Sequence, residues 1–155
     1  MAETWVVNAS PLIALDSIGR LGLLGLLGRD VAVPPAVLRE VSHGGRTALP
    51  TTVAILDSVE LVPTVVMWGL GGGETEVLSH ASRSTNTEAI LDDLAARQCA
   101  AAHGIPTRGT LGVIVIAKRL GVISAAKPIF ESLRQAGFYV ASGILEAALK
   151  AAGEQ

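Results

Sequence analysis

The sequence predicts an α/β fold in which a parallel sheet is covered by helices on both faces. Short apolar runs, such as residues 4–7 and 30–33, alternate with segments whose apolar residues have helical spacing. The length of 155 residues fits one domain, residues 1–155, with a sizeable core. Half of the residues are hydrophobic but only 3% are aromatic, so the expected core is aliphatic.

The first half of the chain is expected to contain three strands, over residues 4–7, 30–33 and 59–62. A helix is predicted to begin at Ser10 and Pro11, because serine caps helices and proline suits the first helical position. Gly19 is expected to end that helix. Further helices are predicted over residues 20–28, 36–41 and 51–57, and another over about two turns from Glu74 to Leu78.

The second half is expected to add a strand over 88–91 and a short strand or edge at 104–107. Helices are predicted over residues 94–103, 111–120, 128–136 and 142–152. In open α/β sheets the active site lies at the carboxyl ends of the strands. The polar side chains that follow each strand are therefore the first candidates for chemistry.

Charge and composition exclude several classes of protein. Twelve Lys and Arg against fourteen Asp and Glu give a net charge of −2, which argues against broad binding to phosphates but not against a small acidic site. Cys99 is the only cysteine, so no internal disulfide forms, and the histidines lack zinc-site spacing. With no signal peptide and no long apolar stretch, we expect a soluble, cytoplasmic protein without a membrane segment.

Asp92 and Asp93 are the strongest chemical signal in the sequence. Two adjacent carboxylates at the end of a strand repel each other unless a cation lies nearby. The structural alternative is that one of them caps the helix that begins at Leu94. The two roles are compatible, since one carboxylate can cap while the other binds a metal.

Glu40 and Glu74 are further candidate ligands, each with a structural alternative. Glu40 can be an ordinary surface residue of an amphipathic helix, and Glu74 can complement the dipole of the helix that follows its glycines. Those glycines lack the spacing of a dinucleotide-binding turn or a P-loop. Nucleophilic catalysis is unsupported, because Ser10 has no nearby histidine in the sequence and Cys99 lies in an alanine-rich helix.

Five segments in this order resemble a PIN-like domain. They are VVNASPLIAL (6–15), VPPAVLREV (33–41), LGGGETEVLSHA (70–81), ILDDLAARQCAAAHGIPTRGTLGVIVIAKRLGVI (90–123) and LRQAGFYVASGILEAALKAAGE (133–154). More narrowly, the chain resembles the bacterial and archaeal group of PIN proteins of similar length that are predicted to bind nucleic acid. The VapC-type toxins of toxin–antitoxin pairs are related to that group.

The resemblance implies a three-layer α/β/α fold with a central parallel sheet of four or five strands in the order 3-2-1-4-5. It implies a Mg²⁺- or Mn²⁺-dependent endoribonuclease whose acids hold the metal. The family's acids fall on Glu40, on Asp93 with Asp92 beside it, and on Asn8. The fourth acid falls near Thr110, and Glu74 matches a Gly-Glu motif of the group.

Two departures from the acidic set keep a second hypothesis open. Asn8 offers an amide oxygen without charge, and Thr110 offers only a hydroxyl. The first hypothesis is a metal-dependent ribonuclease that acts as a toxin. The second is a catalytically silent PIN-like module that binds protein or RNA.

The ribonuclease hypothesis also names supporting residues, and the resemblance implies partners. Ser10 and Thr110 would support the site or contact phosphate. Arg97 and Arg108, with Lys118 and Arg119, would contact the RNA backbone, although each can also be ordinary solvated surface. The expected partners are RNA, a cognate antitoxin protein and a second copy of the chain in a homodimer.

Overall fold

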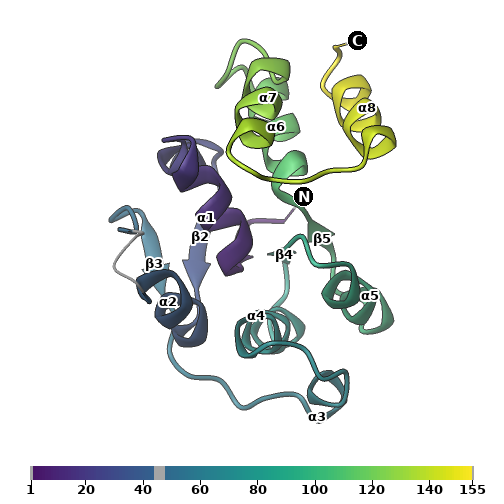
Figure 1. The fold of residues 1–155 in the computed structure, drawn as a ribbon. Helices are drawn as coiled ribbons and strands as arrows, with labels where there is room; N and C mark the ends of the chain where they lie inside the picture. The colour runs from purple at the N-terminus through teal and green to yellow at the C-terminus, as the bar shows by residue number, and fades with distance from the viewer. Residues whose placement is uncertain (1, 44–47, 155) are drawn as a thin grey trace.

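The computed structural model describes residues 2–43 and 48–154, and its centre is a five-stranded parallel sheet (Figure 1). The strand order is β3-β2-β1-β4-β5, as the resemblance implied. The strands are β1 (Thr4–Val7), β2 (Asp30–Val33), β3 (Val53–Ile55), β4 (Thr87–Ile90) and β5 (Thr107–Arg108). Because all five are parallel, their carboxyl ends meet at one edge of the sheet.

Helices cover both faces of this sheet, which confirms the three-layer α/β/α prediction. The last three residues of β1 and of β2 and all four residues of β4 are buried, so side chains on both faces are shielded from water. Continuous burial of this kind is typical of parallel sheets. The largest fully buried side chains are mainly aliphatic and include Trp5, Leu12, Leu24, Ile90 and Ile114.

Three helical segments accompany the first two strands: α1 (Ala9–Ser17), the 3-10 helix η1 (Leu21–Leu26) and α2 (Pro35–Ser42). The predicted start of α1 was late by one to two residues, because Asn8 and not Ser10 is the N-cap. The Ser10 hydroxyl instead donates to Asp92. Gly19 follows the helix with a φ of 68°, a conformation that favours glycine.

Two predictions for the segment after α2 were wrong. Residues 53–55, expected in a helix, form β3, because they pair in parallel register with β2 and Val33 lies opposite Ile55. The β-branched residues Thr51, Thr52, Val53 and Ile55 favour this strand. Residues 59–62, expected in a strand, form none, since β3 already occupies that edge of β2, and they lead into α3 (Pro63–Val66).

The remaining helices are close to those predicted. They are α4 (Gly72–Ser82), α5 (Leu94–Ala102), α6 (Thr110–Arg119), α7 (Lys127–Gln135) and α8 (Ser142–Ala151). Helix α4 has 11 residues, which is longer than the two turns expected, because it begins within its glycines. It packs against α2, β1 and β4, while α6 packs against β5, α1 and α8.

Helix α8 lies against α6, and its partly buried residues Leu145, Ala148 and Leu149 pack on the core. None of its own residues is fully buried. Beyond it, Glu154 accepts hydrogen bonds from the backbone N–H groups of Ala126 (2.6 Å) and Lys127 (3.0 Å), and Lys118 Nζ lies 3.4 Å from Glu154 Oε2. We call this set of contacts the Glu154 latch. Across the described residues, no helix has the length and apolar character needed to span a bilayer.

Candidate functional site

The carboxyl ends of the central strands bring Asn8, Asp92 and Asp93 to one edge of the sheet. Asn8 follows β1 and is 6% exposed. Its side chain makes no capping hydrogen bond, and its buried Oδ1 accepts none from any residue that the structure describes. A buried amide oxygen without a donor is unfavourable unless another group, such as water or a cation, contacts it.

Glu40 reaches the same place from α2, and Gly73 makes this approach possible. The Gly73 N–H donates to Glu40 Oε1 at 3.0 Å. A Cβ at Gly73 would lie 2.5 Å from Glu40 Oε1 and 3.1 Å from Asn8 Oδ1. The two oxygens therefore lie close to the same point. Sequence reasoning missed Gly73, although the glycine run before Glu74 was a signal for close approach of side chains to the backbone.

Glu74 adds a third oxygen-bearing group, and its carboxyl has a raised pKa. Burial, followed by the negative charges of Asp93 and Glu40, raises the pKa of the Glu74 carboxyl above its usual value. Asp93 therefore lies near enough to Glu74 to repel it. One Asp93 oxygen, Oδ2, accepts from the Ala96 N–H at 2.9 Å, so Asp93 caps α5 as the structural alternative required.

Asp92 has a different set of partners from Asp93. Its Oδ1 accepts from the Thr110 N–H (2.8 Å), and its Oδ2 accepts from the hydroxyls of Thr110 (2.7 Å) and Ser10 (3.2 Å). These bonds join the junctions that follow β1, β4 and β5. Asp92 thus holds the first turns of α1 and α6 together, and we call Ser10, Asp92 and Thr110 the junction clamp.

The described residues contain no group of three His, Cys, Asp and Glu side chains in the arrangement of a ready-made metal site. The oxygen cluster of Asn8, Glu40, Glu74 and Asp93 nevertheless has the chemistry that hard divalent cations prefer. A cation would satisfy the buried Asn8 oxygen and would reduce the repulsion that raises the pKa of Glu74. The donor set therefore fits Mg²⁺ or Mn²⁺ with water completing the coordination.

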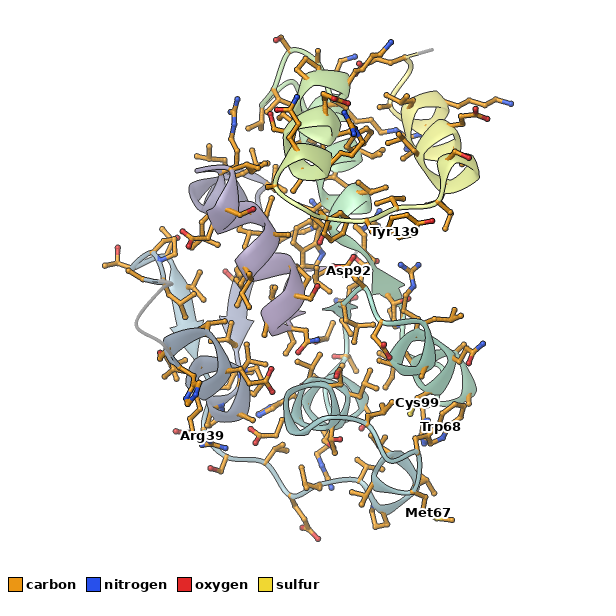
Figure 2. The ribbon with its side chains drawn as sticks, in the orientation of Figure 1. Arg39, Met67, Trp68, Asp92, Cys99 and Tyr139 are labelled. Carbon is orange, nitrogen blue, oxygen red and sulfur yellow. The ribbon has the colours of Figure 1, made fainter. Side chains whose placement is uncertain are left out.

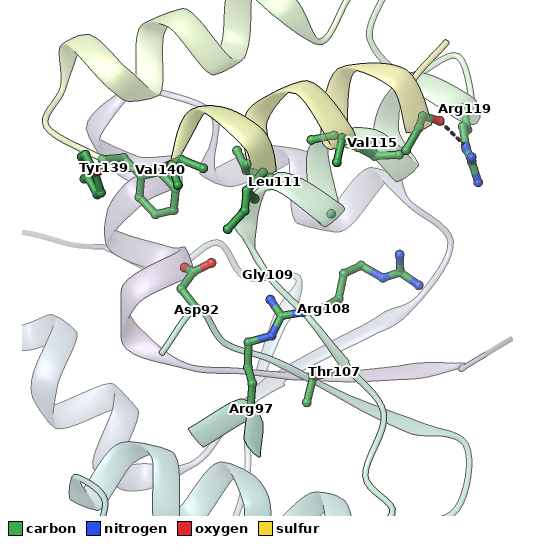
Figure 3. A pocket seen from close by; sticks show the side chains of 17 residues that line it. Asp92, Arg97, Thr107, Arg108, Gly109, Leu111, Val115, Arg119, Tyr139 and Val140 are labelled. Carbon is green, nitrogen blue, oxygen red and sulfur yellow. Dashed lines mark hydrogen bonds between the residues drawn. The ribbon is translucent and has the colours of Figure 1, made fainter. Parts of the chain in front are cut away.

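A groove of about 710 Å³ opens beside Asp92, between α8 and the strand β5 (Figure 3). Arg97, Arg108 and Arg119 contribute to its lining. Arg108 Nε donates to the buried Glu88 carboxylate at 3.2 Å, and Arg119 Nε donates to the Ala151 carbonyl at 2.9 Å. Of the four basic residues predicted to contact RNA, Lys118 alone is absent from this lining, and it belongs to the Glu154 latch.

A family model described as PIN domain matches residues 4–154. The chain belongs to the PIN domain family. Searches of curated proteins and of solved structures found no match.

The PIN domain assignment confirms the resemblance to a PIN-like domain and identifies a nuclease-type fold. In this PIN domain, Asn8 and Glu40 meet at Gly73, and Glu74 lies within range of the charges of Glu40 and Asp93. Asp92 instead accepts hydrogen bonds from Thr110. Cys99 is buried, and burial raises the pKa of its thiol, so it is unsuited to nucleophilic attack. The roles assigned to the individual site residues stay predictions.

Proposed function

We propose that this PIN domain is a divalent-metal-dependent endoribonuclease. The observation that carries the proposal is the buried, unpartnered Oδ1 of Asn8 beside the Glu40 carboxylate. Glu74 and Asp93 add negative charge to the same place. Carboxylates and an amide oxygen at the carboxyl edge of a parallel sheet suit Mg²⁺ or Mn²⁺.

Asn8, Glu40, Glu74 and Asp93 would hold the ion, which supplies an acidified water and charge stabilisation at the scissile phosphate. Asp93 keeps its position because α5 begins on it, and Glu40 keeps its position through the Gly73 N–H. The junction clamp fixes the first turns of α1 and α6 around the site. Arg97 and Arg108 are placed to contact phosphates of the substrate strand.

The test is cleavage of RNA by the full chain with Mn²⁺ or Mg²⁺, with Glu40→Gln, Asp93→Asn and EDTA as comparisons. Each substitution and EDTA should reduce the rate by at least about a hundredfold, because each removes charge stabilisation of the transition state. The exposed acid Glu146 on α8 offers a control, and Glu146→Gln should cleave as the unaltered chain does. Cleavage that survives EDTA would exclude metal dependence.

A catalytically silent binding module is the second candidate function. Asn8 supplies no negative charge, and Thr110 uses its hydroxyl and its N–H to bind Asp92. Isothermal titration with Mn²⁺ separates the two candidates. Binding that is lost in Glu40→Gln supports the nuclease, whereas the absence of binding to the unaltered chain supports the silent module.

The toxin role, a cognate antitoxin, a homodimer and a cytoplasmic location are further parts of the proposal. They are supported by the likeness to toxin–antitoxin nucleases and by exposed apolar side chains such as Met67, which is 83% exposed. Arrest of growth on expression, relieved by co-expression of the neighbouring gene, would test the toxin role. Sedimentation of the purified chain would test the homodimer.

A further inference from the structure

The groove between α8 and β5 has walls of different chemistry (Figure 3). On one side, Arg97 and Arg108 point toward the groove from α5 and β5. On the other side, α6 and α8 present aliphatic side chains, including Leu111, Val115, Ile144 and Ala148. One end of the groove is Asp92, so the groove is continuous with the edge of the sheet that carries the acids.

The charged wall carries the guanidinium groups of Arg97 and Arg108, which could bind an anion in the groove. Among the described residues Arg97 forms no ion pair. Its Nη1 and Asp92 Oδ1 each lie 2.9 Å from the position of a Cβ on Gly109, so Arg97 stands at the end of the groove beside Asp92. Arg108 is anchored through Nε to Glu88, which is 7% exposed and also accepts from Trp5 Nε1 at 2.9 Å. This anchoring fixes the direction of the Arg108 side chain before any ligand binds.

Tyr139 lies at the end of the groove nearest Asp92, as Figures 2 and 3 show. It is in the segment between α7 and α8 and is 89% exposed. A side chain with this exposure buries almost no area in the fold, so packing does not account for an aromatic residue here. An aromatic ring beside guanidinium groups is the combination that binds unpaired bases and their phosphates.

We propose that this groove is a subsite for an unpaired nucleotide, in which Tyr139 contacts the base and Arg97 and Arg108 contact phosphates. The aliphatic wall of α8 would shield the remaining face of the base. A base in a duplex is stacked and paired and cannot reach this wall, so the subsite selects single strands. That the nucleotide flanks a cleaved phosphate rests on the proposed nuclease function, whereas its binding does not.

The experiment measures binding of a fluorescently labelled, short single-stranded RNA to the full chain in EDTA, where no metal-dependent cleavage occurs. Tyr139→Ala should weaken binding about tenfold, and Tyr139→Trp should retain it, because stacking requires only an aromatic face. Trp68 offers a matched control, since it is an exposed aromatic residue far from the groove (Figure 2), and Trp68→Ala should bind within about twofold of the unaltered chain. Arg97→Gln should reduce the slope of log affinity against log salt by about one.

Three results would overturn the subsite. They are unchanged binding by Tyr139→Ala, equal binding of duplex and single-stranded RNA, and stronger binding of an acidic peptide than of RNA, which would assign the groove to a protein partner. Cleavage assays with Mn²⁺ separate this proposal from the nuclease. If RNA binding depends on Tyr139 but no RNA is cleaved, only the nuclease proposal is rejected. If RNA is cleaved but Tyr139→Ala binds RNA unchanged, only the subsite proposal is rejected.

Discussion

Asn8 decides how much negative charge gathers at the carboxyl edge of the sheet. It follows the central strand and is buried, and its side-chain oxygen lies near Gly73 beside Glu40. An aspartate there would add a fourth negative charge to Glu40, Glu74 and Asp93, where burial and the charges of Asp93 and Glu40 already raise the pKa of the Glu74 carboxyl. The amide supplies an oxygen ligand without that added repulsion, at the expense of weaker attraction for a cation.

A substitution of Gly73 tests whether cleavage requires the Glu40 side chain to approach the backbone at this point. Gly73→Ala would place a Cβ 2.5 Å from Glu40 Oε1, which is the end of a flexible, exposed side chain. The Glu40 carboxylate would therefore move aside, so we expect little loss of unfolding free energy but a large loss of cleavage. Gly72 is the control because a Cβ there meets nothing within 4 Å. Gly72→Ala should leave stability equal or slightly higher, as alanine favours helices. Cleavage assays of both variants with Mn²⁺ measure the difference, and equal cleavage by Gly73→Ala and Gly72→Ala would contradict the crowding.

The two adjacent aspartates should respond differently to the same substitution. Asp93→Asn keeps an N-cap that is nearly as good, so stability should change little while metal binding and cleavage fall. Asp92→Asn loses an acceptor among the Thr110 and Ser10 bonds and should lower the unfolding free energy by about 1–3 kcal/mol. Urea unfolding with Mn²⁺ titration measures both effects, and equal destabilisation would reject this division of roles.

At the scale of elements, α8 combines packing of its own partly buried residues on α6 with contacts that lie beyond its last residue. None of its residues is fully buried, and the Glu154 latch joins the segment after it to the start of α7 and to Lys118. Hydrogen bonds from the Ala126 and Lys127 N–H groups, assisted by Lys118, hold the pKa of Glu154 below its usual value. The latch therefore sets how firmly α8 closes one side of the groove.

The lowered pKa of Glu154 gives a pH-dependent prediction. A carboxyl whose pKa is lower in the folded state stabilises the fold above its unfolded pKa, and this contribution is lost as pH falls through the folded pKa. Glu154→Gln should therefore lower the Tm by a few degrees at neutral pH, and the difference should disappear in acid. Thermal unfolding against pH measures this. Glu146→Gln, on the exposed face of α8, should show no such dependence.

The order of strands and helices could be predicted from the sequence wherever an apolar run had a clear boundary. The run at 4–7 ends at Asn8 and the run at 30–33 ends at two prolines, and both are strands with the predicted bounds. Residues 51–62 contain two short apolar segments of similar composition. Which of them pairs depends on the free edge of β2, and local sequence does not contain that information.

The candidate site was predictable in its residue types but not in its partners. The adjacency of Asp92 and Asp93 predicted a functional site at the end of β4. Only the fold shows that Thr110, 18 residues away in the chain, donates hydrogen bonds to Asp92. Tyr139 was not predicted either, because a lone tyrosine in a short apolar segment has no pattern that indicates a site. Its relevance comes from the groove that α8 and β5 form around it.

For the whole molecule, metal binding can be measured through the stability of the fold. A ligand that binds only the folded state stabilises it by about 2.7 kcal/mol at a hundred times its Kd. Saturating Mn²⁺ should therefore raise the Tm of the full chain by several degrees. Glu40→Gln should remove the increase and Glu146→Gln should keep it. An equal increase in all three would mean that the ion binds elsewhere.

The strand order also has a consequence for synthesis of the chain. The strand made first, β1, lies in the middle of the sheet and pairs with β2 and β4. Thr4 pairs with Thr87, so one flank of the central strand stays unpaired until more than half of the chain has left the ribosome. During that interval the apolar residues Trp5, Val6 and Val7 expose a bare strand edge, which is the stage most open to aggregation. Slowing translation between β3 and β4 would lengthen this stage and lower the soluble yield.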